Sequence, residues 1–205
     1  MSDQVLGIEA SRANLERMLQ EMLDHPDRKE ALTAEIERVF GRRKAVMVLD
    51  MSGFSRTTQQ HGIVSFLLMI HQMHVLTRPC IAEHGGLTVK EEADNLFCLF
   101  DTPQAALDAA RAIHRTLTTA NHLLPEERKL YASIGIGFGD ILYIGEEDLF
   151  GNEVNLASKL GEDIAERGET LLTQAARAAL PGAVAGLEEL QLAISGLSLT
   201  YYRVG

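Results

Sequence analysis

Apolar residues recur at helical spacing in two stretches within the first 43 positions. His25-Pro26-Asp27 separates the two stretches, and Gly41-Arg42-Arg43 ends the second. Because apolar residues three or four apart share one face of a helix, each stretch predicts an amphipathic helix. The apolar positions are Leu15, Met18, Leu19, Met22 and Leu23, then Leu32, Ile36, Val39 and Phe40. We expect residues 1–43 to form a helical N-terminal extension that packs on the main domain or on a partner subunit.

The pattern changes at Lys44, and the remainder predicts one domain over residues 44–205. The run Lys44–Asp50 is short, apolar and rich in valine, which is typical of a buried strand. Alternation of Ile134, Ile136 and Phe138 with glycines indicates another strand. The predicted elements are a strand over 44–50, a helix over 62–83, hairpin strands over 87–90 and 95–100, a helix from Thr102-Pro103, a strand over 131–138, a turn at Gly139-Asp140, a strand over 141–144, a helix over 152–167, and strands over 170–173 and 199–203.

The order of these elements indicates the fold class. Strand, helix, strand, strand, helix, strand is typical of a ferredoxin-like α+β fold, an antiparallel sheet with helices on one face. Many unrelated activities use this fold, so the function has to be argued from particular residues.

Composition and charge narrow the class of protein. Hydrophobic residues make up 46% of the 205 positions, which is too apolar for a disordered chain. The net charge of −10 disfavours generic binding to nucleic acid or to anionic membranes. No signal peptide is recognisable, and the uncharged stretch 57–77 is broken by polar side chains. We expect a cytoplasmic protein with no nucleic-acid or membrane partner.

A first candidate site lies where the strand over 44–50 ends. Asp50 is followed by Met51-Ser52-Gly53-Phe54, a turn that contains glycine. The backbone N–H groups of such a turn can bind an anion, and the adjacent carboxylate can hold a divalent cation. An aspartate at a strand end is more often a cap of a turn or helix, so both interpretations stay open for this segment alone.

A second candidate is the tip of the predicted hairpin, Lys90-Glu91-Glu92-Ala93-Asp94. In a ferredoxin-like sheet this hairpin neighbours the first strand, so Asp94 can face Asp50. Two carboxylates that converge beside an anion-binding turn favour a two-metal phosphoryl site. A solvated acidic hairpin tip is the alternative.

A third candidate lies on the predicted helix over 152–167. Asn155 and Lys159 are four residues apart and share a face away from the apolar Val154 and Ala157. An amide beside a cation suits an anionic group, and an ordinary exposed polar face is the alternative.

Together, these segments resemble the catalytic domain of the class III nucleotide cyclases, the adenylate and guanylate cyclase family. VLDMSGFS (48–55) resembles the family's first metal segment, and GGLTVKEEADNLFCLF (85–100) resembles the second. The run over 134–173 resembles the long third block, with a shortened hairpin around 143–147. Their order and spacing match the family from about Lys44 to the C-terminus.

The resemblance implies a metal and phosphate set. Asp50, Asp94 and the backbone carbonyl of Met51 match the ligands of two Mg²⁺ or Mn²⁺ ions per site. The matching phosphate turn, whose N–H groups hold the β- and γ-phosphates of ATP, consists of Ser52, Gly53, Phe54 and Ser55.

The resemblance also implies a purine and ribose set. Lys90 and Asp148 match the pair that selects adenine, in which the carboxylate accepts from the amino group and the lysine donates to a ring nitrogen. Guanine presents an oxygen where adenine has that donor, so it would oppose the carboxylate. Asn155 matches the asparagine that orients the ribose, and Lys159 stands where the family has a transition-state arginine.

The family builds each active site between two catalytic domains. This chain has one copy of each half, so the resemblance implies a homodimer that converts ATP to 3′,5′-cyclic AMP and pyrophosphate. Three positions depart from the family: Lys159 replaces arginine, Ser195 replaces a phosphate-contacting lysine, and Ala93 replaces glycine. Lysine lacks the planar fork of arginine. The alternative function is a cyclase-like module that dimerises and binds nucleotide or metal with little turnover.

Overall fold

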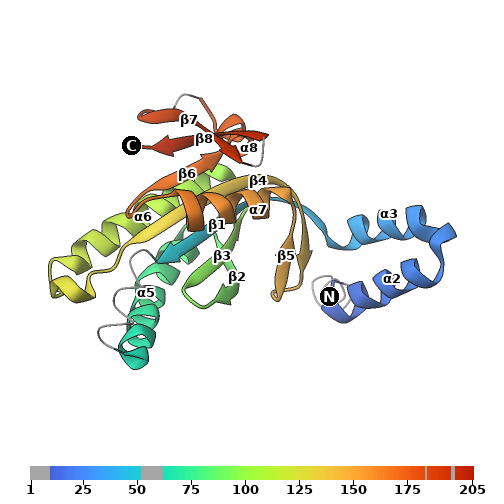
Figure 1. The fold of residues 1–205 in the computed structure, drawn as a ribbon, viewed down its shortest axis with the longest axis horizontal. Helices are drawn as coiled ribbons and strands as arrows, with labels where there is room; N and C mark the ends of the chain where they lie inside the picture. Colours follow the sequence, from blue (N-terminus) through green and yellow to red (C-terminus); the bar gives the residue numbers. More distant parts are fainter. Residues whose placement is uncertain (1–9, 52–61, 183, 195–196) are drawn as a thin grey trace.

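The computed structural model describes residues 10–51, 62–182, 184–194 and 197–205, and Figure 1 shows a curved sheet with a pair of helices extending from one end. The helices are α2 (Arg12–Asp24), η1 (Pro26–Arg28), α3 (Lys29–Phe40), α5 (Ile63–Glu83), α6 (Pro103–Asn121), η2 (Glu126–Arg128), α7 (Asn152–Ser158), the π-helical η3 (Lys159–Ile164) and α8 (Gln174–Ala179). The strands are β1 (Gly41–Met51), β2 (Leu87–Glu92), β3 (Asn95–Phe100), β4 (Ala132–Ile144), β5 (Asp148–Phe150), β6 (Thr170–Thr173), β7 (Leu187–Ile194) and β8 (Leu197–Val204).

All of these strands belong to one sheet, in the order β2-β3-β1-β4-β6-β8-β7, with β5 paired to β4. Only the β4–β6 pairing is parallel among the described strands. The central strand β1 places Val46 between Leu99 of β3 and Gly137 of β4. The elements β1, α5, β2, β3, α6 and β4 follow the expected order, which confirms the predicted α+β, ferredoxin-like fold class.

The two faces of the sheet are covered by different helices. Successive side chains of a strand point to opposite faces, so Met47 packs in the core that contains α5 and α6, whereas Val48 packs in the core that contains α7. The βαββαβ part therefore has its two helices on one face, as predicted. The shorter α7, which follows that part, covers the other face.

Glycines allow α7 and η3 to lie close to the sheet. A Cβ on Gly135 of β4 would sit 2.0 Å from the carbonyl oxygen of Ala157, and a Cβ on Gly161 would sit 2.8 Å from that of Val48. Real Cβ atoms do not approach oxygen this closely, so larger side chains would push the helical segment away. The alternation of isoleucine and glycine in β4 thus serves packing: isoleucine fills one face, and glycine admits a helix on the other.

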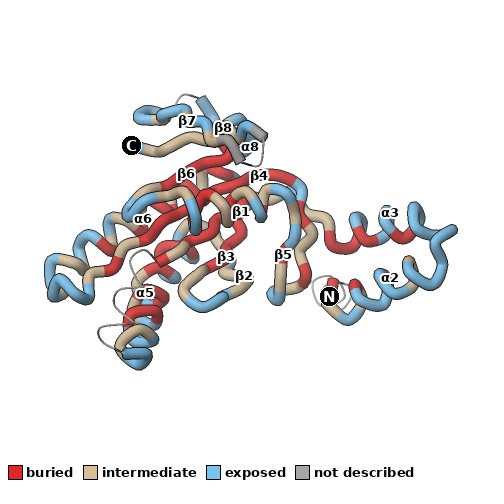
Figure 2. Tube along the Cα trace, viewed as in Figure 1, coloured by how far each residue is buried: buried red, intermediate tan, exposed pale blue. Residues whose placement is uncertain are grey.

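The N-terminal helices α2 and α3 form a small core of their own with the end of β4. Met18 and Phe40 are completely buried there, together with Ile144. Figure 2 shows that burial is confined to the inner sides of this helix pair. Leu19 and Leu23 remain exposed at 46% and 74%, although their spacing placed them on the apolar face. Both predicted helices are confirmed, and β1 begins at Gly41.

Two local predictions were wrong. The expected turn at Gly139-Asp140 does not form, because these residues pair with Lys44 and Arg43 and β4 continues through them to Ile144. The helix expected over 152–167 is α-helical only to Ser158, continues as η3, and ends at Ile164, since Ala165 is extended. The elements β7 and α8 were not predicted, whereas β5 is the second strand of the hairpin that the resemblance implied around 143–147.

No helix in the described part of the chain combines the length and apolar character needed to cross a bilayer.

Candidate active site

Lys90 and Asp148 lie in contact although 58 positions separate them in the sequence. The Lys90 Nζ atom donates to Asp148 Oδ1 at 3.1 Å, and it also lies 2.7 Å from Glu92 Oε1. The lysine comes from β2 and the aspartate from the first position of β5, which the short turn at 145–147 folds back against β4. The ammonium lies 5.1 Å from the centroid of the Phe97 ring, close enough for a cation–π contact.

Both members of this pair have partners of opposite charge. Burial opposes ionisation of Asp148, but hydrogen bonds from Arg12 and Lys90 outweigh it, so the pKa of Asp148 lies below its ordinary value. Burial also opposes the charge on Lys90, but hydrogen bonds to Glu92 and Asp148 raise its pKa above the ordinary value. The carboxylate is therefore ionised and the lysine protonated at neutral pH.

Asp50 and Asp94 form a second group, at the adjoining ends of β1 and the β2–β3 hairpin. Leu49 pairs with Leu96 in the sheet, which brings Asp50 beside the hairpin turn that carries Asp94. Burial, together with the negative charges of Asp94 and Glu162, raises the pKa of Asp50 to about 7, and burial is the largest of these causes. These carboxylates thus converge closely enough to repel each other.

The donor chemistry of this second group fits a hard divalent cation. The carboxylates of Asp50 and Asp94 and the backbone carbonyl of the adjacent Met51 offer oxygen atoms, the type of ligand that Mg²⁺ and Mn²⁺ prefer. The raised pKa of Asp50 shows that its charge is poorly compensated by the protein, and a bound cation would supply that compensation. Among the described residues, no group of three or more His, Cys, Asp or Glu side chains is arranged as a complete metal site.

Asn155 and Lys159 lie one helical turn apart, because the Lys159 N–H donates to the Asn155 carbonyl at the end of α7. Asn155 is exposed. The Lys159 Nζ atom lies 2.6 Å from Asp163 Oδ2, so the lysine forms an ion pair within its own chain. Glu153 anchors α7, since its Oε2 atom accepts from Thr173 Oγ1 at 2.6 Å and from the Phe138 N–H at 3.0 Å.

Some predicted residues lie outside the described part of the chain. The phosphate turn of Ser52, Gly53, Phe54 and Ser55 belongs to the undescribed segment 52–61, and Ser195 is likewise undescribed. Ala93, which stands where the related family has glycine, has a φ of +52°, in the left-handed region that favours glycine.

Sequence reasoning missed two residues of this region. Arg12, the first residue of α2, donates to Asp148 at 2.8 Å. Glu162 lies near enough to Asp50 to raise its pKa. Neither residue belongs to a recognisable motif. The contact of Arg12 with Asp148 depends on where α2 lies relative to the β4–β5 turn.

Comparison with known proteins gives sequence and structural relatives. No protein-family model matches the chain. A Rhizobium meliloti (strain 1021) protein named "Putative adenylate cyclase 3" is 28% identical over 132 residues, which are 64% of this chain and 22% of that protein. An adenylate cyclase of Streptomyces coelicolor is 29% identical over 124 residues, which are 60% of this chain and 31% of that protein. The chain thus spans less than a third of these two curated relatives.

A crystal structure of an adenylate/guanylate cyclase/hydrolase from Silicibacter pomeroyi superposes with a TM-score of 0.69. That similarity covers 80% of this chain and 98% of the other, at 27% identity. The chain has the class III nucleotide cyclase fold. The family resemblance carried by the three sequence segments is therefore confirmed by sequence relatives and by overall structure.

Proposed function

We propose that the chain is a metal-dependent nucleotide cyclase that converts ATP to 3′,5′-cyclic AMP and pyrophosphate. The observation that carries the proposal is the contact between Lys90 and Asp148, which joins two distant segments into the pair expected for adenine. The resemblance of the fold and sequence to adenylate and guanylate cyclases supports the same reaction class. ATP should be preferred to GTP, because the guanine oxygen would face the Asp148 carboxylate.

The reaction joins the 3′-oxygen of ATP to its own α-phosphorus. The bond from that phosphorus to the oxygen bridging to the β-phosphate breaks, pyrophosphate leaves, and the hydroxyl proton passes to water. Asp50, Asp94 and the Met51 carbonyl would hold Mg²⁺ or Mn²⁺, which when bound supplies positive charge to the phosphates and the attacking hydroxyl. Lys90 and Asp148 would hold the base, Asn155 would orient the ribose, and Lys159 would stabilise charge in the transition state.

The proposed site is assembled from two copies of the chain. We assign residues 44–205 to the catalytic domain and 1–43 to an extension that precedes it. One copy would contribute Asp50 and Asp94, and its partner would contribute Lys90, Asp148, Asn155 and Lys159. A homodimer would then hold two equivalent sites.

A second candidate function is a cyclase-like module that binds nucleotide with little turnover. The contact between Lys159 and Asp163 favours it, because a lysine committed to a carboxylate of its own helix is less available to a phosphate. A lysine also offers fewer directed donors than the arginine of the family.

The experiment is product formation by the purified protein with ATP or GTP in the presence of Mn²⁺ or Mg²⁺. We expect cyclic AMP from the wild type, near-complete loss in Asp50→Asn, and little change in the control Asp140→Asn, whose side chain is 81% exposed on β4. Nucleotide binding without product would favour the binding module. Absence of both binding and product would contradict both functions.

A further inference from the structure

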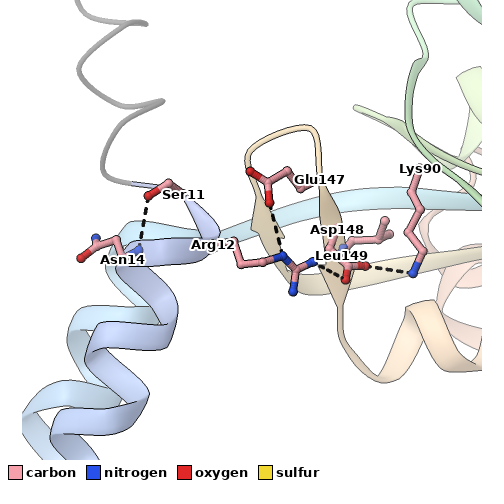
Figure 3. A network of polar contacts seen from close by, with 7 residues as sticks. All are labelled: Ser11, Arg12, Asn14, Lys90, Glu147, Asp148 and Leu149. Atoms are coloured by element: carbon pink, nitrogen blue, oxygen red, sulfur yellow. Dashed lines mark hydrogen bonds and ion pairs between the residues drawn. The ribbon is translucent and has the colours of Figure 1, made fainter.

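Arg12 joins the N-terminal helices to the proposed base-recognition residues. Its Nη2 atom donates to Asp148 Oδ2 at 2.8 Å, and its Nε atom donates to Glu147 Oε2 at 3.3 Å (Figure 3). These contacts connect residues 136 and 135 positions apart. Through these contacts the N-terminal extension reaches Asp148, the side chain expected to select the purine.

The position of Arg12 is fixed by the fold. Ser11 caps α2 by accepting from the Asn14 N–H at 3.3 Å, and Met18 buries the helix against the end of β4. A helix N-terminus carries partial positive charge, so a cation in the first turn is unfavourable to the helix itself. The location of an arginine there is explained by the two carboxylates that it meets, and not by helix formation.

Both carboxylate oxygens of Asp148 already accept hydrogen bonds from donors of the same chain. Oδ1 accepts from Lys90 Nζ at 3.1 Å and from the Leu149 N–H at 3.0 Å, while Oδ2 accepts from Arg12. The Asp148 side chain is only 13% exposed. A purine amino group that approaches this carboxylate must therefore share or displace the donor on Oδ2, because Oδ1 already has two donors.

We propose that Arg12 tunes purine binding by competing with the base amino group for Asp148 Oδ2, so that docking of α2 and binding of ATP oppose each other. The inference rests on the proposed function, since it assumes that Asp148 meets the base. Binding free energies are reciprocal: if docked Arg12 weakens ATP binding, bound ATP weakens docking of α2 by the same factor.

The size of the effect is limited by the exposure of the arginine. The Arg12 side chain is 43% exposed, and partly exposed ion pairs contribute modestly to stability. Removal of Arg12 should therefore tighten ATP binding by about two- to fivefold. The gain should be specific to a base that donates to Asp148, because a base with an oxygen at that position does not compete with Arg12 for an acceptor.

The test measures binding of 3′-deoxy-ATP and 3′-deoxyinosine triphosphate with Mn²⁺ by calorimetry. Both lack the attacking hydroxyl, and only the first has the amino group. Arg12→Ala should bind 3′-deoxy-ATP about two- to fivefold more tightly than the wild type, with no gain for the inosine nucleotide. Glu147→Gln, which leaves Asp148 untouched, should give a smaller gain in the same direction. The matched control is Arg17→Ala, which removes an exposed arginine on the same helix that pairs with Glu21.

A second readout is hydrogen exchange of the α2 backbone. We expect 3′-deoxy-ATP to increase exchange in α2 of the wild type and to have no further effect on α2 in Arg12→Ala. Equal or weaker binding of 3′-deoxy-ATP by Arg12→Ala and Glu147→Gln would overturn the inference while leaving the proposed function intact. If neither the wild type nor any variant binds either nucleotide, the proposed function and this inference are both overturned.

Discussion

The two halves of the proposed site balance charge in opposite ways. In the purine half, Asp148 has Lys90 and Arg12 as partners, and its pKa lies below the ordinary value. In the metal half, Asp50 is half-buried beside the turn that carries Asp94, and its pKa rises to about 7. One carboxylate is held by cations of the chain, and the other is destabilised by burial and by its neighbours.

This difference indicates what each half needs from its ligand. A cation bound at Asp50 and Asp94 would relieve repulsion that the chain leaves in place. A base bound at Asp148 would replace contacts that already exist, so only part of its interaction energy would appear as affinity. We therefore expect the metal half to depend strongly on its cofactor, and the purine half to provide selectivity more than affinity.

The largest expected effect of a change in the purine half is on base selectivity. Asp148→Asn replaces a pure acceptor with a group that can also donate to the guanine oxygen. The preference for ATP over GTP, measured as the ratio of the two kcat/KM values, should fall by about a hundredfold. Asp140→Asn is the control, and an unchanged ratio in Asp148→Asn would remove Asp148 from base recognition.

Restoring the cations of the family should increase the rate of the chemical step. The double substitution Lys159→Arg with Ser195→Lys adds donors where negative charge develops, so kcat should rise by about tenfold with little change in nucleotide affinity. Measurements at saturating ATP on both single variants and on the double variant check this. A folded double variant that binds ATP but is no faster than the wild type would show that these positions do not limit turnover.

The balanced charge of the purine half predicts a particular pH dependence of stability. A carboxyl with a lowered folded-state pKa stabilises the fold above its unfolded pKa, and the contribution is lost as pH falls through the folded-state pKa. Wild type should therefore exceed Asp148→Asn in the free energy of unfolding by about 1 kcal/mol, constant from pH 7 to about pH 5. The difference should shrink below pH 3.8, the ordinary value for this group. Urea unfolding of both proteins at several pH values tests this. If the difference in free energy of unfolding grows on acidification, Asp148 is not stabilised by Lys90 and Arg12 as described.

A smaller effect is expected at the turn of the metal half. Ala93 has a φ of +52°, which costs a residue with a Cβ about 1–2 kcal/mol relative to glycine. Glycine also loses more entropy on folding, by about 0.4–1 kcal/mol, so Ala93→Gly should stabilise the protein by about 0.5 kcal/mol. Thermal or urea unfolding measures this gain, and a loss of stability would show that the turn accommodates alanine without strain.

The parts of the fold that the sequence predicts best have strong local patterns. A continuous valine-rich run predicts β1, helical spacing of apolar residues predicts the two N-terminal helices, and Thr102 caps α6 as the Thr102-Pro103 pair suggests. The turn expected at Gly139 was wrong because its glycine serves the approach of Glu153 on α7, which is a tertiary requirement. The short β5 is defined by pairing with β4 and has no pattern of its own.

The candidate site was predictable to a similar extent. Family resemblance placed Lys90 and Asp148 together before the structure did, and the register of β1 with β3 accounts for Asp50 beside the Asp94 turn. Arg12 was not predictable, because an ion pair across 136 residues depends on where α2 packs. The pairing of Lys159 with Asp163 was visible only as an i, i+4 spacing, and the sequence did not indicate that η3 would be π-helical.

The central claim is that the metal half of one chain and the purine half of its partner act on the same nucleotide. It is tested most directly by mixing Asp50→Ala and Asn155→Ala proteins, each nearly inactive alone, and measuring cyclic AMP after subunit exchange. A mixed dimer has one site with neither lesion, so an equal mixture should recover about a quarter of the wild-type rate. Mixing Asp50→Ala with itself is the control. Demonstrated formation of mixed dimers without recovery of activity, in a protein whose wild type makes cyclic AMP, would contradict the account.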